Sequence, residues 1–306
     1  MIKLQICNID EIAKEFTKRI EESIVKNKFS ETEKKHLGGN SFSKGNILQK
    51  RIFKLYLCKP ELLKKESADF ETYLHDNFTN IQRKNIVSKY FDYKNVLNYK
   101  QEGISNAYWL MQKLNIRVCP YCNRSFTFTI RRGETGSRPE FDHFNSQDNY
   151  PYLSLSFYNL IPSCPICNHK KSTSEIDINP YLEDFGDRCR FQIDNIERCL
   201  LLSNYKEWNI YMDKIGNKYD NNINIFLLCE FYNEHKDYIS EIVFKARAYT
   251  SGYYENLVNT FHNQGLTERE MNLLIFGCYF ESQDLNLRPL SKLTRDVVEQ
   301  VGIKIF

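Results

Sequence analysis

The sequence predicts an α+β protein that is mainly helical, with a small unit of two strands and one helix inserted between two larger helical regions. Three observations support this fold class. Two Cys-x-x-Cys pairs, Cys119/Cys122 and Cys164/Cys167, enclose one short segment. Apolar residues recur at helical spacing before and after that segment. Stretches that alternate apolar and polar residues, as strands do, lie mainly inside it.

We expect three regions along the 306-residue chain: a basic helical region over 1–117, the central unit over 118–180 and a mostly helical region over 181–306. A chain of this length can bury a sizeable core. Hydrophobic residues make up 42% and charged residues 26%, which is ordinary for a soluble globular protein. There is no apolar run long enough to span a membrane and no secretory leader, so we expect a cytoplasmic protein without membrane contact.

The first region should consist of helices. Apolar residues recur every four positions from Ile12 to Ile24, which predicts an amphipathic helix over 10–28 with Asp10 as its N-cap. The polar segment 29–44 contains two adjacent glycines and should be a loop. Apolar periodicity then predicts further helices over 47–56, 70–78, 86–91 and 107–114.

The central unit should begin with strands and end with a helix. Residues 125–130 alternate aromatic or aliphatic residues with polar ones, which is the period of a strand. A turn over 131–136 should follow, and then a second strand that ends at Asp142-His143. After a loop, a short helix should begin near Cys164.

Beyond residue 180 the patterns are mixed. Residues 191–193 and 200–202 favour strands, whereas residues 223–249 show the longest helical pattern in the chain. Glycines and an Arg-Pro pair separate later helices, the last of them over 291–300.

The two cysteine pairs predict a structural zinc site. Two such short loops can place four thiolates tetrahedrally around one zinc ion, which would pin the central unit. The other six cysteines stand singly, as small buried hydrophobic residues do. Cys119-Pro120-Tyr121-Cys122 is also the active-site motif of glutaredoxins, but that fold needs the motif near its start. The second pair favours zinc.

Between the cysteine pairs lie residues suited to metal-assisted hydrolysis. Asp142 offers a hard oxygen ligand, His143 an imidazole that titrates near neutrality, and Asn159 an amide that can orient the imidazole. Hydrolysis of a phosphodiester needs an activated water and a cation that neutralises charge in the transition state. Thiolates select zinc, whereas oxygen ligands select Mg²⁺ or Mn²⁺. The segment therefore suits one structural and one catalytic metal.

At these residues the chain resembles the HNH endonucleases, whose active site is a ββα-metal finger. The family pattern is Cys-x-x-Cys, Asp-His, Asn, and then Cys-x-x-Cys-Asn with a Lys three positions later, and every landmark is present in this order. The resemblance implies that His143 is the general base and that Asp142 and Asn168 hold the catalytic Mg²⁺ or Mn²⁺. It also implies that Asn159 positions His143. His169 is an alternative to Asn168 as metal ligand.

The residues in and around the motif are similar to those of HNH effectors in Septu-like and retron-associated bacterial anti-phage systems. That resemblance implies cleavage of DNA, most simply double-stranded DNA, and a separate ATPase partner, since the chain has no Walker-type loop. Lys171 and Arg124 are expected to contact the nucleic acid. Two alternatives stay open: a stand-alone restriction-type nuclease, and a non-catalytic zinc ribbon that binds nucleic acid or another protein.

Charge is distributed unevenly, although the whole chain carries only +3. Residues 1–118 contain 22 Lys/Arg against 14 Asp/Glu, and residues 181–306 contain 14 against 19. A basic surface beside a nuclease finger would attract the phosphate backbone through counterion release. Solvated lysine-rich helices explain the same counts, so both interpretations stand.

Overall fold

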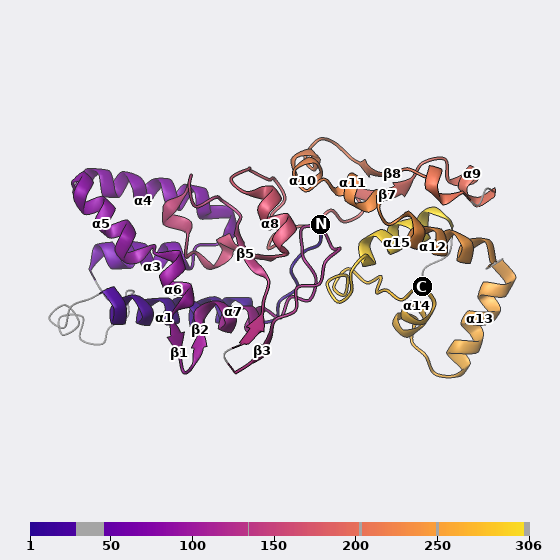
Figure 1. Cartoon of the computed structure of the whole chain (residues 1–306), viewed down its shortest axis with the longest axis horizontal. Coiled ribbons are helices and arrows are strands. Elements are labelled where there is room, and N and C mark those ends of the chain that lie inside the picture. The colour runs from indigo at the N-terminus through magenta and orange to yellow at the C-terminus, as the bar shows by residue number, and fades with distance from the viewer. Residues whose placement is uncertain (29–45, 134, 202–203, 249–250, 303–306) are drawn as a thin grey trace. The chain divides into compact units, whose positions relative to one another are not determined.

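The protein is mainly helical, as predicted, and its strands pair in two-stranded sheets (Figure 1). The computed structural model describes residues 1–28, 46–133, 135–201, 204–248 and 251–302, so the loop expected over 29–44 lies outside the described residues. The helices are α1 (Ile9–Lys28), α3 (Ile47–Tyr56), α4 (Leu63–Asn77), α5 (Asn80–Tyr90), α6 (Tyr93–Asn98), α7 (Asn106–Leu114), α8 (Pro165–Lys171), α9 (Ile196–Leu201), α10 (Asp220–Ile225), α11 (Leu228–Asn233), α12 (Lys236–Ala248), α13 (Ser251–Asn263), α14 (Glu268–Phe276) and α15 (Ser291–Gln300). The strands are β1 (Lys100–Gln101), β2 (Ile104–Ser105), β3 (Ile130–Arg132), β4 (Thr135–Ser137), β5 (Glu140–His143), β6 (Leu160–Ser163), β7 (Cys189–Ile193) and β8 (Ile210–Lys214).

The chain divides into two compact units, each assembled from separate segments. The N-terminal unit comprises Ile6–Ile116 and Thr127–Glu175. The C-terminal unit comprises Met1–Gln5, Arg117–Phe126 and Ile176–Phe306. Segments that are far apart in the sequence therefore share one core in each unit.

The core of the N-terminal unit forms around α1. Phe16, Ile20 and Ile24 on its apolar face are fully buried, which confirms the amphipathic helix. The ring of Phe16 lies 6.5 Å from that of Trp109 on α7 and 6.0 Å from that of Phe157. Asp10 lies within the first turn of α1 rather than before it, so the prediction that Asp10 is the N-cap is wrong.

Local sequence sets where the next helices begin. A capping box of Asn46 and Gln49 opens α3, which has the predicted bounds. A second box, of Thr79 and Gln82, opens α5 directly after the extended residue Phe78 ends α4. The helices predicted over 70–78 and 86–91 therefore exist but begin earlier, because polar helix-forming residues precede the apolar ones that marked them.

Two strands and one helix form a ββα unit in the centre of the chain, but the partner of the strand that ends at His143 is β6, which lies in the stretch expected to be a loop. β5 pairs antiparallel with β6, so that Asp142 lies opposite Ile161 and His143 opposite Leu160. The helix α8 follows β6 directly, and Cys164 is its N-cap. Strand β5 packs against α8, which brings side chains of the strand and the helix to one place.

The strand predicted over 125–130 is wrong. The first strand of this region, β3, begins at Ile130 and pairs with β4 in a short ribbon. Phe126 and Phe128 are 54% and 40% exposed, whereas Thr127 between them is buried and its hydroxyl donates to the carbonyl of Ile116. The alternation is real, but the polar residue faces inward.

The β3–β4 ribbon depends on close backbone approach at Gly136. A Cβ atom at this position would lie 2.3 Å from the carbonyl oxygen of Ile130 on the paired strand. It would also lie 3.1 Å from the hydroxyl of Tyr108 on α7. Only glycine leaves the space that this pairing needs.

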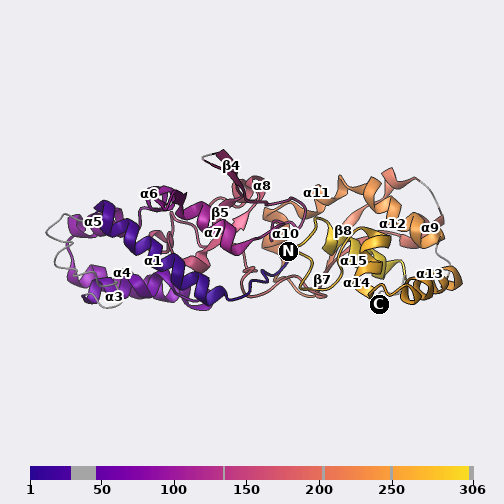
Figure 2. The same cartoon turned by 90° about the horizontal axis from the view of Figure 1, so that it is seen from below.

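The C-terminal unit is built on the β7–β8 hairpin and on α15, which packs against β7 (Figure 2). The strand predicted at 191–193 and the helix over 291–300 are confirmed. The strand expected at 200–202 is wrong where it is described, because Leu201 ends α9. The single helix expected over 223–249 is also wrong, since α10, α11 and α12 replace it.

Asparagine contacts explain the broken helix. The side chain of Asn222 accepts hydrogen bonds from the backbone of Asp177 and Ile178, and that of Asn233 bonds to both backbone groups of Ile210. Leu227, between α10 and α11, has a left-handed backbone with φ of 48°. Apolar periodicity continues through these breaks because the same core lies beside all three helices.

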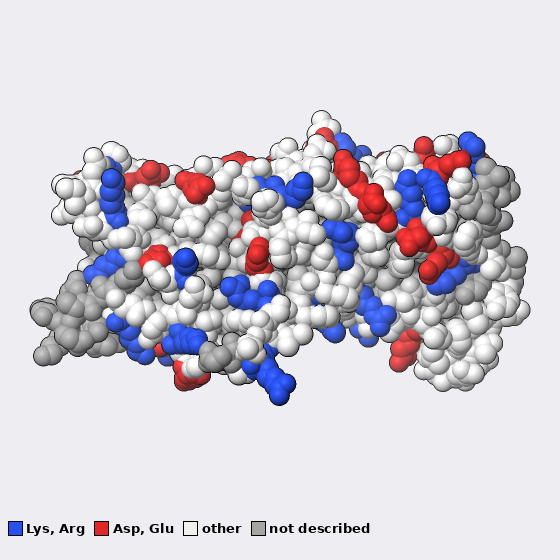
Figure 3. Space-filling view, viewed as in Figure 1, with Lys and Arg blue, Asp and Glu red and all other residues white. Residues whose placement is uncertain are grey.

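The surface carries both signs of charge. Acidic and basic side chains are interspersed on the face that Figure 3 shows. Within the part of the chain that the structure describes, no helix has the length and apolar character to cross a membrane.

Candidate active site and metal centre

The four cysteines come together as predicted. Their sulfur atoms all lie within 4.8 Å of one another, and all four residues are buried. The sulfur of Cys122 accepts a hydrogen bond from the amide of Arg124, and that of Cys164 accepts one from the amide of Cys167. Such bonds favour the thiolate form, which is the form that binds zinc. The donor set therefore fits a structural zinc ion.

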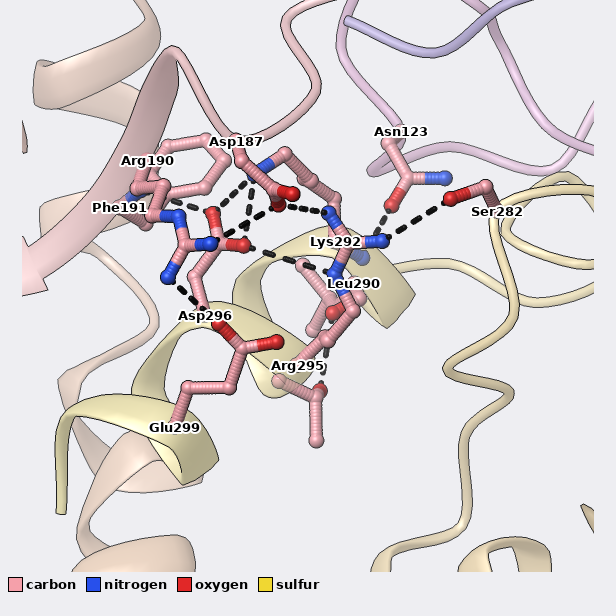
Figure 4. Close-up of polar contacts among 11 residues, drawn as sticks. Asn123, Asp187, Arg190, Phe191, Ser282, Leu290, Lys292, Arg295, Asp296 and Glu299 are labelled. Atoms are coloured by element: carbon pink, nitrogen blue, oxygen red, sulfur yellow. Dashed lines mark hydrogen bonds and ion pairs between the residues drawn. The ribbon is translucent and has the colours of Figure 1, made fainter. Parts of the chain in front are cut away.

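The first cysteine loop is held by bonds to Asn123, which has a left-handed backbone with φ of 49° (Figure 4). Its side-chain oxygen accepts from the amide of Lys292, at 2.9 Å, and its side-chain nitrogen donates to the carbonyl of Leu285. Its own carbonyl accepts from the amide of Leu290. Next to it, the carbonyl of Cys122 accepts from the hydroxyl of Tyr232. The loop is thus fixed by two helices, α11 and α15, and by the turn residues before α15, all more than a hundred residues further along the chain.

A buried ion pair supports the start of α15. The ammonium of Lys292 lies 2.5 Å from the carboxylate of Asp296, one turn along the same helix, and both side chains are almost fully buried (Figure 4). Asp296 also accepts from the amide of Phe191 on β7. The pair therefore joins α15 to the hairpin while the backbone of Lys292 holds Asn123.

His143 stands at the end of β5 with its imidazole fixed in orientation. Its Nε2 lies 3.0 Å from the carbonyl oxygen of Ser154. The ring of Tyr93, the first residue of α6, packs edge-on with centroids 4.6 Å apart. Burial lowers the pKa of His143 to about 4; the Ser154 contact opposes this shift, and the charge of Lys171 adds to it. The imidazole is therefore neutral at neutral pH.

Asp142 and Lys171 form a buried pair beneath the site. The two side chains are 4% and 0% exposed, and their charged atoms are 3.4 Å apart. The ammonium of Lys171 also donates to the carbonyl of His143, at 2.6 Å. Burial lowers the pKa of Lys171, and Asp142 opposes that shift. The sequence predicts that Lys171 contacts nucleic acid. In the structure its ammonium is buried and contacts the Asp142 carboxylate and the His143 carbonyl instead.

Asn168 lies on the same side of α8 as Lys171, one turn earlier. Its side-chain nitrogen donates to the carboxylate of Glu140, at 2.7 Å. Glu140 and Asp142 alternate on one face of β5, so their carboxylates and the Asn168 amide face the same strand–helix junction. These hard oxygen donors fit Mg²⁺ or Mn²⁺. His169, the alternative ligand, is exposed.

Asn159 is fully buried and acts on the backbone around His143. Its side-chain oxygen accepts from the amide of Asn145, at 2.8 Å. Its side-chain nitrogen donates to the carbonyls of Asn145 and Leu153. These bonds fix the segment that follows His143 and the segment that leads to Ser154. These bonds hold the two backbone segments that flank the imidazole, and the orientation of His143 by Asn159 stays a prediction.

Arg124 lies in the C-terminal unit, where its guanidinium packs over the ring of Phe231, 4.3 Å from the ring centre. Sequence reasoning missed Tyr93, Ser154 and Glu140. Glu140 shares the strand parity of Asp142 and could have been found from it. Tyr93 carries no signal in the sequence, because it reaches the site through the fold.

Residues 119–174 match the family model of the HNH endonucleases, so the chain contains an HNH endonuclease domain. Among curated proteins, the Septu protein PtuB of Bacillus thuringiensis is 33% identical to this chain over 82 residues. The match covers 27% of this chain and 30% of the relative's length. No solved structure matches the chain significantly.

Proposed function

We propose that the chain is a metal-dependent endonuclease that hydrolyses DNA phosphodiester bonds. The observation that carries the proposal is the contact between His143 and the Ser154 carbonyl. Because a carbonyl can only accept, Nε2 holds the ring hydrogen and Nδ1 keeps its lone pair. The neutral ring can then take a proton from the attacking water through Nδ1 at neutral pH.

Asp142 and Asn168 would hold the catalytic Mg²⁺ or Mn²⁺, with Glu140 on the same face. When bound, the cation supplies positive charge at the scissile phosphate and the leaving oxygen. Lys171 holds both the Asp142 carboxylate and the His143 carbonyl, so it fixes the ligand relative to the base. The four cysteines would hold Zn²⁺, which stabilises a small core that is marginal by itself.

We further propose a role as the effector nuclease of a bacterial anti-phage system that works with a separate ATPase. The similarity to a Septu protein supports this setting. Under this proposal the substrate is double-stranded DNA, and the protein works in the cytoplasm.

The nuclease proposal is tested by incubating the purified protein with plasmid DNA and Mg²⁺, with and without EDTA. We expect cleavage that EDTA abolishes. His143→Ala should lower the cleavage rate by roughly a hundredfold or more while the variant keeps its zinc and its fold, because only the base is removed. Cleavage by this variant at the wild-type rate would contradict the assignment of His143 as the general base.

Asn168→Ala and His169→Ala separate the two candidate ligands. If Asn168 holds the metal, its variant should need a higher Mg²⁺ concentration for half-maximal cleavage, whereas His169→Ala should resemble the wild type. The reverse pattern would make His169 the ligand.

A further inference from the structure

The imidazole of His143 is held by a short segment that lies outside the matched HNH domain. This segment, Tyr90–Tyr93, joins α5 to α6 and is called the α5–α6 elbow here. Its last residue, Tyr93, supplies the ring that packs edge-on against the imidazole, at 4.6 Å and 63°. The domain that carries His143 begins at residue 119, so this contact joins distant parts of the chain.

The elbow also contacts Ser154, the residue whose carbonyl bonds the imidazole. The hydroxyl of Ser154 donates to the carbonyl of Phe91, at 2.9 Å. The carbonyl of Ser154 is the group that bonds Nε2 of His143. The amide of Tyr93 donates to the same Phe91 carbonyl, also at 2.9 Å. One carbonyl of the elbow therefore ties together the hydrogen-bond acceptor of the imidazole and the aromatic ring beside it.

The elbow is itself anchored in the core. Phe91 is 2% exposed, and its ring packs against those of Tyr56 and Phe70. The hydroxyl of Tyr56 donates to the carbonyl of Tyr90. Asp92 caps α6 by accepting from the amide of Asn95. A side chain on such a support has little freedom to shift.

The hydroxyl of Tyr93 stays protonated across the physiological range. Burial raises the pKa of Tyr93 to about 12; the charge of Arg138 opposes the shift, and Asp142 and Glu140 add to it. Tyr93 therefore serves neither as a base nor as a nucleophile here. What it offers His143 is the contact of its ring.

We infer that the α5–α6 elbow positions the general base, with Tyr93 as the positioning residue that keeps the imidazole in the one orientation that exposes Nδ1. The inference rests on the proposed nuclease function. An imidazole with space beside it can rotate about its Cβ–Cγ bond, which breaks the contact of Nε2 with the Ser154 carbonyl and turns Nδ1 away from its position. Edge-to-face packing of the Tyr93 ring opposes such a rotation. The N-terminal helices are thus part of the catalytic apparatus rather than an attached module.

Kinetics of full-length variants on a short DNA duplex with Mg²⁺ test this inference. Tyr93→Leu removes the ring and should lower kcat by about tenfold while KM changes by less than about twofold, because the base is misplaced but the DNA surface is intact. Tyr93→Phe keeps the ring and should restore kcat to within about twofold of the wild type.

Tyr73→Leu is the matched control. Its ring is also half-buried and packs edge-on or tilted against Phe70 and Phe78 in the same unit, so its removal costs similar packing. Its kcat should stay at the wild-type value. Equal decreases of kcat in the Tyr73 and Tyr93 variants would mean that the Tyr93 ring only stabilises the fold, and wild-type kcat in Tyr93→Leu would overturn the inference.

Nitrogen NMR of histidine-labelled protein gives a readout that needs no cleavage. In the wild type, His143 should show the single tautomer with hydrogen on Nε2, and in Tyr93→Leu the two tautomers should mix. Ser154→Ala, which removes the hydroxyl that donates to the Phe91 carbonyl, should move the signal in the same direction. An unchanged tautomer in both variants would refute the elbow's role, whereas a wild type with the expected tautomer but no nuclease activity would refute only the proposed function.

Discussion

At the scale of single residues, the burial of His143 sets the pH range of the proposed reaction. Burial lowers the pKa of its imidazole to about 4 from an ordinary value of 6.5, and the base works only when neutral. The rate of single-turnover cleavage should therefore stay level as pH falls from neutrality to about 5, where an exposed histidine would be mostly protonated. Rates measured across this range, with zinc content checked at each pH, test the expectation. A decline centred near the ordinary pKa would contradict it.

Lys171 makes a second prediction at this scale. Lys171→Met keeps the length of the side chain but leaves the Asp142 carboxylate buried beside no ammonium, which should cost roughly 3–5 kcal/mol of folding free energy. Thermal unfolding should show a clear fall in Tm, whereas Lys170→Met at the exposed neighbouring position should leave Tm unchanged.

The same variant tests the sequence-based role of Lys171. DNA affinity, measured without Mg²⁺ so that no cleavage occurs, should be equal in folded Lys171→Met and wild-type protein. Weaker binding with an unchanged Tm would instead support a direct role of the ammonium in binding phosphate.

At the scale of elements, the ββα unit should depend on zinc. Cys164→Ser removes one of the four clustered sulfurs but leaves a hydroxyl that can still cap α8, so zinc content should fall from about one ion per chain and Tm should fall because of the lost metal. Cys58→Ala is the control, because Cys58 is buried but lies outside the cluster. Metal analysis and thermal unfolding of both variants test whether the ββα unit depends on zinc. Full zinc retention in Cys164→Ser would argue against the four-thiolate site.

Elements set by short-range signals could be predicted from the sequence. Asp142-His143 does end a strand, Cys164 does begin a helix, and Ser291–Gln300 is a helix with the predicted bounds. The four cysteines could be grouped because their spacing requires a common partner. Each of these predictions rests on a pattern within a few residues.

Elements set by long-range contacts could not be predicted. The breaks between α10, α11 and α12 depend on amides of Asn222 and Asn233 that bond to distant backbone. The burial of Lys171 depends on its pairing with Asp142 across the ββα unit. The role of Tyr93 depends on where the elbow places it. In each case the partner lies too far along the chain for local pattern or propensity to reveal it.

At the scale of the whole molecule, the excess of Lys and Arg in residues 1–118 predicts where DNA binds. Lys50, Lys84 and Lys94 are exposed on the N-terminal unit, and Lys94 adjoins Tyr93. Reversing all three to Glu should weaken DNA binding and lower the slope of log affinity against log salt by about 0.9 for each phosphate that the variant no longer neutralises. Fluorescence anisotropy at several salt concentrations measures both quantities.

The matched control is the same reversal at Arg188, Arg198 and Lys206, which are exposed on the C-terminal unit. The total change in charge is identical, so a general effect of net charge would appear in both variants. Equal affinity and slope for the two triple variants would show that the N-terminal unit is not the DNA-binding surface.

The glycine in the β3–β4 ribbon has a consequence for how this sequence can vary. Gly136 needs no unusual backbone angle; what it needs is space, because a Cβ there would lie 2.3 Å from the carbonyl of Ile130. The ribbon leads into β5, so a shift of one strand to relieve that clash would displace the strand that ends at His143. Homologues that cleave DNA should therefore accept substitutions at the exposed neighbours Thr135 and Ser137 but keep glycine at position 136. Purifying selection would hold this glycine as firmly as the histidine, because of the space that the strand pairing leaves for it.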